Sequence, residues 1–123
     1  MSVEVVRSSY EAFNRDDLDE VVSLMSEDAI YDEFDGKRHV GKAAIRAAFE
    51  PQFRGDYGRI RFRTEDVFVD ASADKAMVRW RCEIDKGGRT RFWRGLDLLH
   101  VRDGRVFEKH TYAKAERLKL GES

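Results

Sequence analysis

The stretch AMVRWRCEIDKGGRTRFWRGLDLLHV, residues 76–101, decides the fold class, because apolar and charged residues alternate along much of it. Alternation with a period of two is typical of strands that bury one face and expose the other. The turn sequence at residues 86–88, Lys-Gly-Gly, divides the stretch in two. It therefore predicts a hairpin of strands over residues 76–85 and 90–101.

The strand pattern continues on both sides of this hairpin. Further strands are predicted over residues 59–70 and 105–113, with turns at 72–74 and 102–104. No connection between these strands is long enough for a crossover helix, so the sheet is expected to be antiparallel.

The first half of the chain shows the three- and four-residue periodicity of amphipathic helices instead. Apolar residues recur in this way over residues 3–13 and 18–25, and Glu27 and Asp28 are expected to close the second helix. A third helix is predicted at KAAIRAAFEPQF (residues 42–53), which Pro51 should end or bend. Helices followed by an antiparallel sheet indicate an α+β fold, with the helices covering one sheet face.

Length and composition limit the protein class. The 123 residues contain one proline and no low-complexity linker, so residues 1–123 are expected to form a single domain. The 23 basic and 24 acidic residues nearly cancel, which argues against a nucleic-acid-binding domain. There is no signal-peptide-like stretch and no apolar run of roughly 20 residues, so we expect a soluble cytoplasmic protein without membrane contact.

Alternation also assigns each side chain to a face of the sheet. On the strand over residues 90–101, Asp97 falls in the same row as Trp93 and Leu99. A lone acid is out of place in such a row, since acids are mostly exposed. Two interpretations stay open: a role in an apolar pocket, or a salt bridge to an arginine on a neighbouring strand.

A second group of acids lies in SEDAIYDEFDG, residues 26–36. The stretch is compatible with a solvated loop, a cation site, or a strand end that holds one acid in a pocket. Asp32 and Asp35 are expected at the surface, whereas Glu33 fits a solvated strand end and a pocket base equally well.

Two stretches, LMSEDAIYDEFDGKRHVGKAAIRAAF (24–49) and LDLLHVRDGRVFEKHTY (96–112), resemble the nuclear transport factor two-like superfamily. The resemblance is to its SnoaL-like and ketosteroid-isomerase-like branch, and it extends over nearly the whole chain. It implies a cone: a curved antiparallel sheet wrapped by N-terminal helices (a cystatin-like α+β roll), with an apolar pocket inside. Members of this superfamily include isomerases, cyclases, epoxide hydrolases, dehydratases, and domains that only bind or dimerise.

The resemblance also implies a site. Glu33 aligns with the general base of ketosteroid isomerases, and Asp97 aligns with their protonated, hydrogen-bond-donating Asp. The isomerase tyrosine falls near Ser9, so Tyr10, one position further, is a candidate donor. Thr111 takes the place of an Asp used by SnoaL-type cyclases and epoxide-hydrolase-like members, which disfavours those activities.

If Glu33 and Asp97 share an apolar pocket, burial disfavours charge on at least one of them. A neutral carboxyl group donates to a developing oxyanion while the other carboxylate moves a proton. The expected function is therefore a cofactor-free isomerase or lyase acting on a small hydrophobic carbonyl compound. Its alternatives are a non-catalytic ligand-binding or dimerisation module, and a cyclase or hydrolase. The residues expected to line the pocket are Met25, Phe49, Trp80, Cys82, Trp93 and Thr111.

The three histidines and the single cysteine are the remaining candidates for a metal site or a nucleophile. His39 is expected in a loop, and His100 and His110 on the outer sheet face; without a third ligand, no metal site is predicted. Cys82 is expected to be a small buried side chain, since no base lies beside it on its strand.

Arginines and acids interleave across the strands on that outer face. The resemblance implies a homodimer through this face, and a nucleic acid or an acidic partner is the rival interpretation. The arginines concerned are Arg59, Arg61, Arg63, Arg79, Arg81, Arg89, Arg91 and Arg94.

Overall fold

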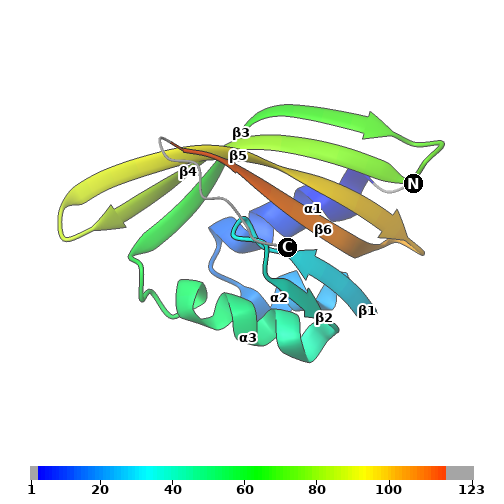
Figure 1. Cartoon of the computed structure of the whole chain (residues 1–123), viewed down its shortest axis with the longest axis horizontal. Coiled ribbons are helices and arrows are strands. Elements are labelled where there is room, and N and C mark those ends of the chain that lie inside the picture. Colours follow the sequence, from blue (N-terminus) through cyan, green and yellow to red (C-terminus); the bar gives the residue numbers. More distant parts are fainter. Residues whose placement is uncertain (1–2, 116–123) are drawn as a thin grey trace.

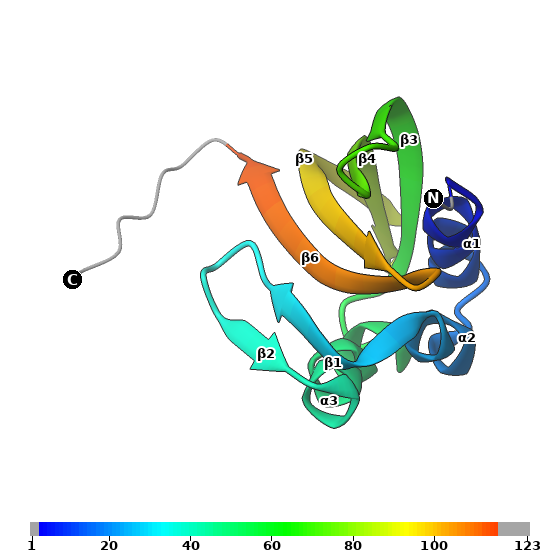
Figure 2. The same cartoon turned by 90° about the vertical axis from the view of Figure 1, so that its right-hand side faces the viewer.

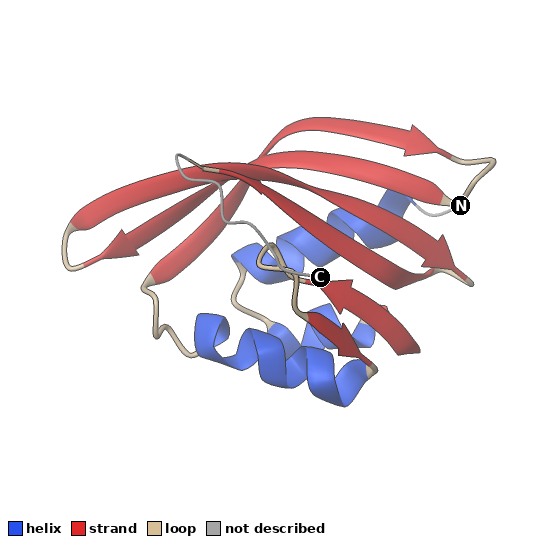
Figure 3. Ribbon diagram, viewed as in Figure 1, coloured by secondary structure: helices blue, strands red, loops and turns tan. Residues whose placement is uncertain are grey.

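The computed structural model describes residues 3–115, so the ends of the expected domain, residues 1–2 and 116–123, lie outside the described residues. The described part combines helices with a mixed sheet, which confirms the α+β class (Figures 1 and 3). In chain order the elements are α1 (Val3–Asn14), α2 (Leu18–Ser23), β1 (Met25–Asp32), β2 (Arg38–Val40), α3 (Lys42–Phe53), β3 (Arg59–Asp70), β4 (Lys75–Lys86), β5 (Arg89–Arg102) and β6 (Arg105–Lys114).

The strands form one curved, unclosed sheet in the order β2-β1-β6-β5-β4-β3 (Figure 2). The strands β3 to β6 are antiparallel, as their short turns predict. The pair β1 and β6 is parallel, which differs from the expected all-antiparallel sheet. These two strands are far apart in the chain, so no hairpin turn fixes their relative direction.

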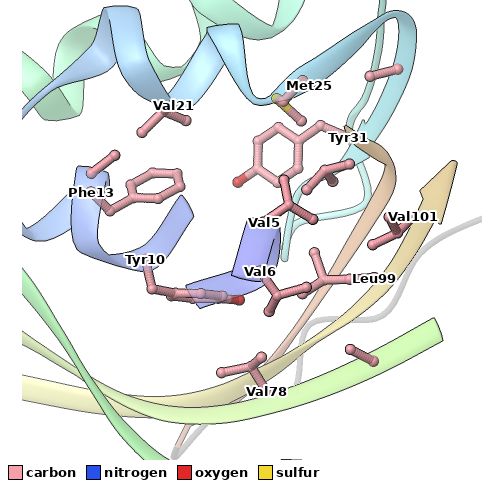
Figure 4. Packing of buried hydrophobic residues seen from close by; sticks show 14 of the residues in the cluster. Val5, Val6, Tyr10, Phe13, Val21, Met25, Tyr31, Val78, Leu99 and Val101 are labelled. Atoms are coloured by element: carbon pink, nitrogen blue, oxygen red, sulfur yellow. The ribbon is translucent and has the colours of Figure 1, made fainter. Parts of the chain in front are cut away.

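The helices lie on one side of the sheet and enclose the core with it (Figures 1 and 3). Val6 and Tyr10 of α1 are buried together with Val78 of β4 and Leu99 of β5 (Figure 4). Apolar side chains of a helix stripe and of one sheet face are thus removed from water, which is the main favourable term in folding. None of the described helices is long and apolar enough to cross a membrane.

The second helix is shorter than its periodicity predicts. It ends at Ser23, and Met25 already begins β1, so Glu27 and Asp28 lie in a strand and do not close the helix. The backbone N–H of Val106 donates to the carbonyl of Leu24 over 2.9 Å and ties this point of the chain to β6. The tertiary pairing therefore overrides the local helical pattern.

The third helix spans residues 42–53 as predicted and ends two residues after Pro51, where Phe53 packs against Phe13 at 5.4 Å between ring centroids. One further expectation about the elements is wrong. His39 lies in the short strand β2, opposite Tyr31 of β1, and not in a loop.

The side chains of the long strands point to the sheet faces that the alternation predicts. Trp80 and Cys82 of β4 are buried, as are Asp97 and Leu99 of β5. The acid that looked out of place in its row is thus inside the molecule.

Candidate functional site

A cavity of about 530 Å³ lies between the sheet and the helices. Its wall is largely aromatic, and the rings of Trp80 and Trp93 meet edge to face at 4.8 Å between centroids. Phe34 and Tyr57 are more than half exposed, so they mark its mouth. The other aromatic side chains of the wall are Phe13, Tyr31, Phe49 and Phe62.

Asp97 lies in the wall of this cavity and is only 1% exposed. Its Oδ2 accepts hydrogen bonds from the Tyr10 hydroxyl and, over 3.0 Å, from Nε1 of Trp80. Its Oδ1 accepts one from Thr111 Oγ1 over 2.5 Å. The side-chain nitrogen of Lys109, Nζ, lies 3.7 Å from Oδ2. Side chains from α1, β4 and β6 therefore converge on one buried carboxyl group.

Burial shifts the protonation of the groups around Asp97. Burial, reinforced by the charge of Asp97, raises the pKa of the Tyr10 hydroxyl well above its usual range, so Tyr10 stays a donor. Burial lowers the pKa of Lys109 from its ordinary value, although the charge of Asp97 acts in the opposite direction. Burial raises the pKa of the Cys82 thiol to about 12, so this wall residue is not a thiolate at neutral pH.

Gly95 of β5 is what allows Trp80 to reach Asp97. A Cβ atom at Gly95 would lie 2.6 Å from Cη2 of Trp80 and 2.4 Å from the carbonyl oxygen of Tyr112. Both distances are far below van der Waals contact, so a side chain at this position would displace the indole. The indole instead lies over the backbone of β5 and donates to the acid two residues further on.

Glu33 lines the same cavity from the turn between β1 and β2. Its backbone N–H donates to the carbonyl of Lys37 over 2.8 Å, which closes the turn. Its Oε2 lies 3.4 Å from Nε2 of His39, whose ring stacks on Tyr31 at 5.8 Å between centroids. Glu33 keeps part of its surface in water and the exposed Asp35 also lines the cavity, whereas Asp97 is dry.

Most of the residues expected in the pocket line the cavity. Phe49, Trp80, Cys82, Trp93 and Thr111 are in its wall, together with Glu33 and Asp97.

Two of the expected site residues are not in the cavity wall. Met25 is buried at the start of β1 but is not part of the cavity wall. Tyr10 is not in the wall either; its hydroxyl donates to Asp97, so it reaches the site through that acid, and its role as a donor to a ligand stays a prediction.

Lys109 is the site residue that the sequence did not single out. The salt-bridge interpretation of Asp97 predicts an arginine as its ionic partner, whereas the partner is this buried lysine of β6. The signal was present in the alternation, since Lys109 and Thr111 share the inward row of the last strand.

Between residues 3 and 115 no group of three or more His, Cys, Asp or Glu side chains is placed to hold a metal ion. His110 lies between two acids, with Nδ1 2.7 Å from Asp32 Oδ2 and Nε2 2.7 Å from Glu108 Oε2. The acids of the 26–36 stretch other than Glu33 have surface partners: Asp32 accepts from Arg38 Nε over 2.7 Å, and Asp28 accepts from Arg102 over 2.6 Å.

Residues 6–109 match the family model described as the SnoaL-like domain. Among solved structures, a proposed polyketide cyclase from Xanthomonas campestris pv. campestris is 28% identical, with a TM-score of 0.75 over 88% of this chain and 86% of that chain. A proposed polyketide cyclase from Pseudomonas putida KT2440 is 27% identical, with a TM-score of 0.73 over 89% of this chain and 88% of that one.

A third structure, a nuclear transport factor two-like protein of unknown function from Mesorhizobium loti, is also 27% identical. Its TM-score is 0.76, over 91% of this chain and 89% of that chain. Among curated protein sequences no significant match is found. The family match spans most of the chain and agrees with the cone of sheet and helices; the chain therefore belongs to the SnoaL-like domain family of the nuclear transport factor two-like superfamily.

Proposed function

We propose that this chain is a cofactor-free acid–base enzyme, an isomerase or a lyase, that acts on a hydrophobic carbonyl compound held in the cavity. One observation supports this most: Glu33, the buried pair of Asp97 and Lys109, and the half-buried Thr111 line the same aromatic cavity. A volume of about 530 Å³ suits a small ring-bearing ligand, since small-molecule sites typically measure ~300–1,000 Å³.

Glu33 is the proton-moving group in this proposal. Its carboxylate is partly solvated, so it exchanges protons with water between turnovers. A ring that stacks on the aromatic wall presents the carbon next to its carbonyl group to Glu33, which removes a proton from that carbon. Return of the proton to another carbon moves the double bond, and loss of a leaving group gives a lyase reaction.

The carbonyl oxygen is expected at the inner end of the cavity, beside Thr111 and Lys109. The ammonium group of Lys109 stabilises the negative charge that develops on this oxygen, in a place from which water is largely excluded. The Thr111 hydroxyl already donates its one hydrogen to Asp97 and so holds the carboxyl group beside the lysine. In this proposal Asp97 positions both side chains: its Oδ1 lies 2.5 Å from Thr111 Oγ1 and its Oδ2 lies 3.7 Å from Lys109 Nζ. The two acting groups in this proposal are therefore the carboxylate of Glu33 and the amine of Lys109, in place of the two carboxyl groups that the resemblance implies.

A polyketide-cyclase-like activity is the second candidate, favoured by the likeness to the two proposed cyclases. Ring closure of an aldol type begins with the same removal of a proton next to a carbonyl group. Thr111 cannot act as a carboxylate base, so in this case too we assign removal of the proton to Glu33.

Exchange of protons for deuterium tests the proposal. Wild-type protein in D₂O is incubated with a panel of one- and two-ring ketones, and proton NMR follows the loss of the signal next to the carbonyl group. Glu33→Gln should slow exchange by about 10²–10⁴-fold, the usual range for a general base. Glu27→Gln makes the same chemical change on an exposed residue of β1 and should leave the rate unchanged.

Each contrary outcome identifies a specific error. A wild-type protein that binds the ketones but exchanges none of them is a ligand-binding module and not an enzyme of this class. Equal rates for wild type and Glu33→Gln would show that Glu33 is not the base.

A further inference from the structure

Lys109 is in an unusual place for a lysine. It is 7% exposed, whereas lysines are almost never buried unless they are paired. Its Nζ lies 3.7 Å from Asp97 Oδ2, which is longer than a direct hydrogen bond. The centre of the Phe13 ring is 4.2 Å away, and the Tyr10 and Phe49 rings lie at 5.2 and 5.7 Å.

Asp97 does not depend on a proton of Lys109 for its hydrogen bonds. Tyr10, Trp80 and Thr111 already donate to its two oxygens. The amine of Lys109 is therefore free of a fixed hydrogen-bond role toward this carboxylate. Burial also lowers its pKa, which increases the share of neutral amine, the nucleophilic form of a lysine.

Lys109 also lies beside the space in which a ligand would bind. Lys109 is part of the cavity wall, with Asp97 and Thr111 on the same part of the sheet and aromatic rings around them. A reactive amine in a largely apolar cavity meets few competing water molecules, which favours condensation over hydrolysis.

We propose that Lys109 forms a covalent imine with a ring-bearing aldehyde or ketone that enters the cavity. This inference rests on the proposed function in one respect, namely that carbonyl compounds bind there. It adds a covalent intermediate and a nucleophile to that function.

The step is balanced without any oxidant or reductant. The lone pair of Nζ attacks the carbonyl carbon, and the carbon–oxygen π electrons move to the oxygen. Asp97, whose Oδ2 is 3.7 Å from Nζ, carries one proton from the nitrogen to this oxygen, which gives a carbinolamine. A second proton moves from the nitrogen to the hydroxyl group by the same route, the carbon–oxygen bond breaks, and the nitrogen lone pair forms the carbon–nitrogen double bond. Aldehyde and amine thus give imine and water.

The imine would make the chemistry of Glu33 easier. A protonated imine withdraws electrons from the neighbouring carbon more strongly than a carbonyl group does. Removal of a proton from that carbon by Glu33 would then produce a neutral enamine in place of an enolate. Lys109 and Glu33 thus act on the same substrate as nucleophile and base.

Reductive trapping tests the inference. Wild-type protein is incubated with 2-naphthaldehyde and sodium cyanoborohydride, which reduces an imine to a stable secondary amine, and the adduct is located by peptide mass spectrometry. We expect most of the adduct on Lys109 and its loss in Lys109→Arg, which keeps the charge but forms no such imine. Lys75→Arg, at an exposed residue outside the cavity, should label at Lys109 like wild type.

A second measurement needs no variant. The unreactive alcohol 2-naphthalenemethanol should compete for the cavity and protect Lys109, but not the exposed Lys75, from labelling. Adduct spread evenly over exposed lysines, or labelling of Lys109 that ignores the alcohol, would overturn the inference. Glu33-dependent deuterium exchange without any adduct on Lys109 would overturn the imine alone and leave the proposed function standing.

Discussion

At the scale of single residues, Asp97 joins three elements that lie far apart in the chain. The Tyr10 hydroxyl comes from α1, the Trp80 indole from β4 and the Thr111 hydroxyl from β6. An ionised carboxylate only accepts hydrogen bonds, and a buried one is tolerated when its oxygens are well supplied with donors. The acid is therefore a structural junction as well as part of the cavity wall.

Removal of this carboxylate should be strongly destabilising. In Asp97→Ala the three donors and Lys109 lose their partner inside the protein, and we expect a loss of about 3–5 kcal/mol in the free energy of unfolding. Urea denaturation followed by tryptophan fluorescence measures it. Asp97→Asn keeps the shape of the side chain and one acceptor, so its free energy of unfolding should fall by less. A loss below about 1 kcal/mol in Asp97→Ala would show that the donors find other partners.

The sequence predicted Asp97 but not Lys109, although the same alternation places both inward. An acid stands out when the other residues of its row are apolar. A lysine among the charged residues of the last strand does not, because lysine is normally exposed and its long side chain usually reaches water. Its burial depends on how far the curved sheet closes over it, which is a property of the folded shape and not of its neighbours in sequence.

At the scale of elements, the parallel pair of β1 and β6 attaches the cavity's Glu33 side to the rest of the sheet. His110 of β6 lies between Asp32 of β1 and Glu108 of its own strand, at 2.7 Å from each. Burial alone would lower the pKa of His110, but the hydrogen bonds and charges of Glu108 and Asp32 outweigh it and raise the pKa above its ordinary value of 6.5. The hydrogen bond from Arg38, with a smaller one from His110, lowers the pKa of Asp32 to about 2.

This bridge should make stability depend on pH. A raised pKa in the folded state contributes stability that is fully present below the unfolded value of 6.5 and is lost as the pH rises through the folded value. The difference in melting temperature between wild type and His110→Gln should therefore be larger at pH 5.5 than at pH 8.5. Asp32 stays ionised across this range.

Asp32→Asn provides the control, because it removes one of the two charges that raise the pKa of His110. In that background the pH dependence of the His110→Gln effect should shrink. A His110→Gln effect of the same size at both pH values would mean that the histidine contributes through packing alone.

Element boundaries show where sequence patterns stop being informative. The hairpins from β3 to β6 follow from alternation and turn residues, both of which are local. The start of β1 does not: Met25 continues the helical spacing of Leu18 and Val21, and it becomes a strand residue because it pairs with Val106. Pairing with a segment so distant in sequence leaves no trace in a local pattern.

At the scale of the whole molecule, the outer sheet face stays uncovered by the helices (Figures 1 and 2). Leu98 of β5 and Tyr112 of β6 are exposed on it, and Arg94 pairs with Glu65 over 3.1 Å nearby. A face that combines apolar residues with charges of both signs suits a two-fold contact with a second copy, in which each patch meets itself. We propose that the chain forms a homodimer through this face.

Light scattering after size exclusion tests the dimer. Wild type should elute with twice the mass of the 14.3 kDa chain, and Leu98→Glu should shift it to the monomer by placing like charges in the interface. Val40→Glu makes the same change at an exposed residue of the edge strand β2 and should remain dimeric. A monomeric wild type, or a dimeric Leu98→Glu protein, would contradict the proposed interface.

The parallel pairing of β1 with β6 also has a consequence for the order of folding. Ser26 and Val106, which meet there, are 80 residues apart, so the contact closes a long loop, whereas the β3–β6 hairpins close short ones. Loop closure becomes entropically more expensive with length, and distant contacts form slowly. The hairpins carrying Asp97 and Lys109 are therefore expected to assemble first, and the segment carrying Glu33 to dock last. Acid and amine become parts of one cavity only when the chain has closed on itself.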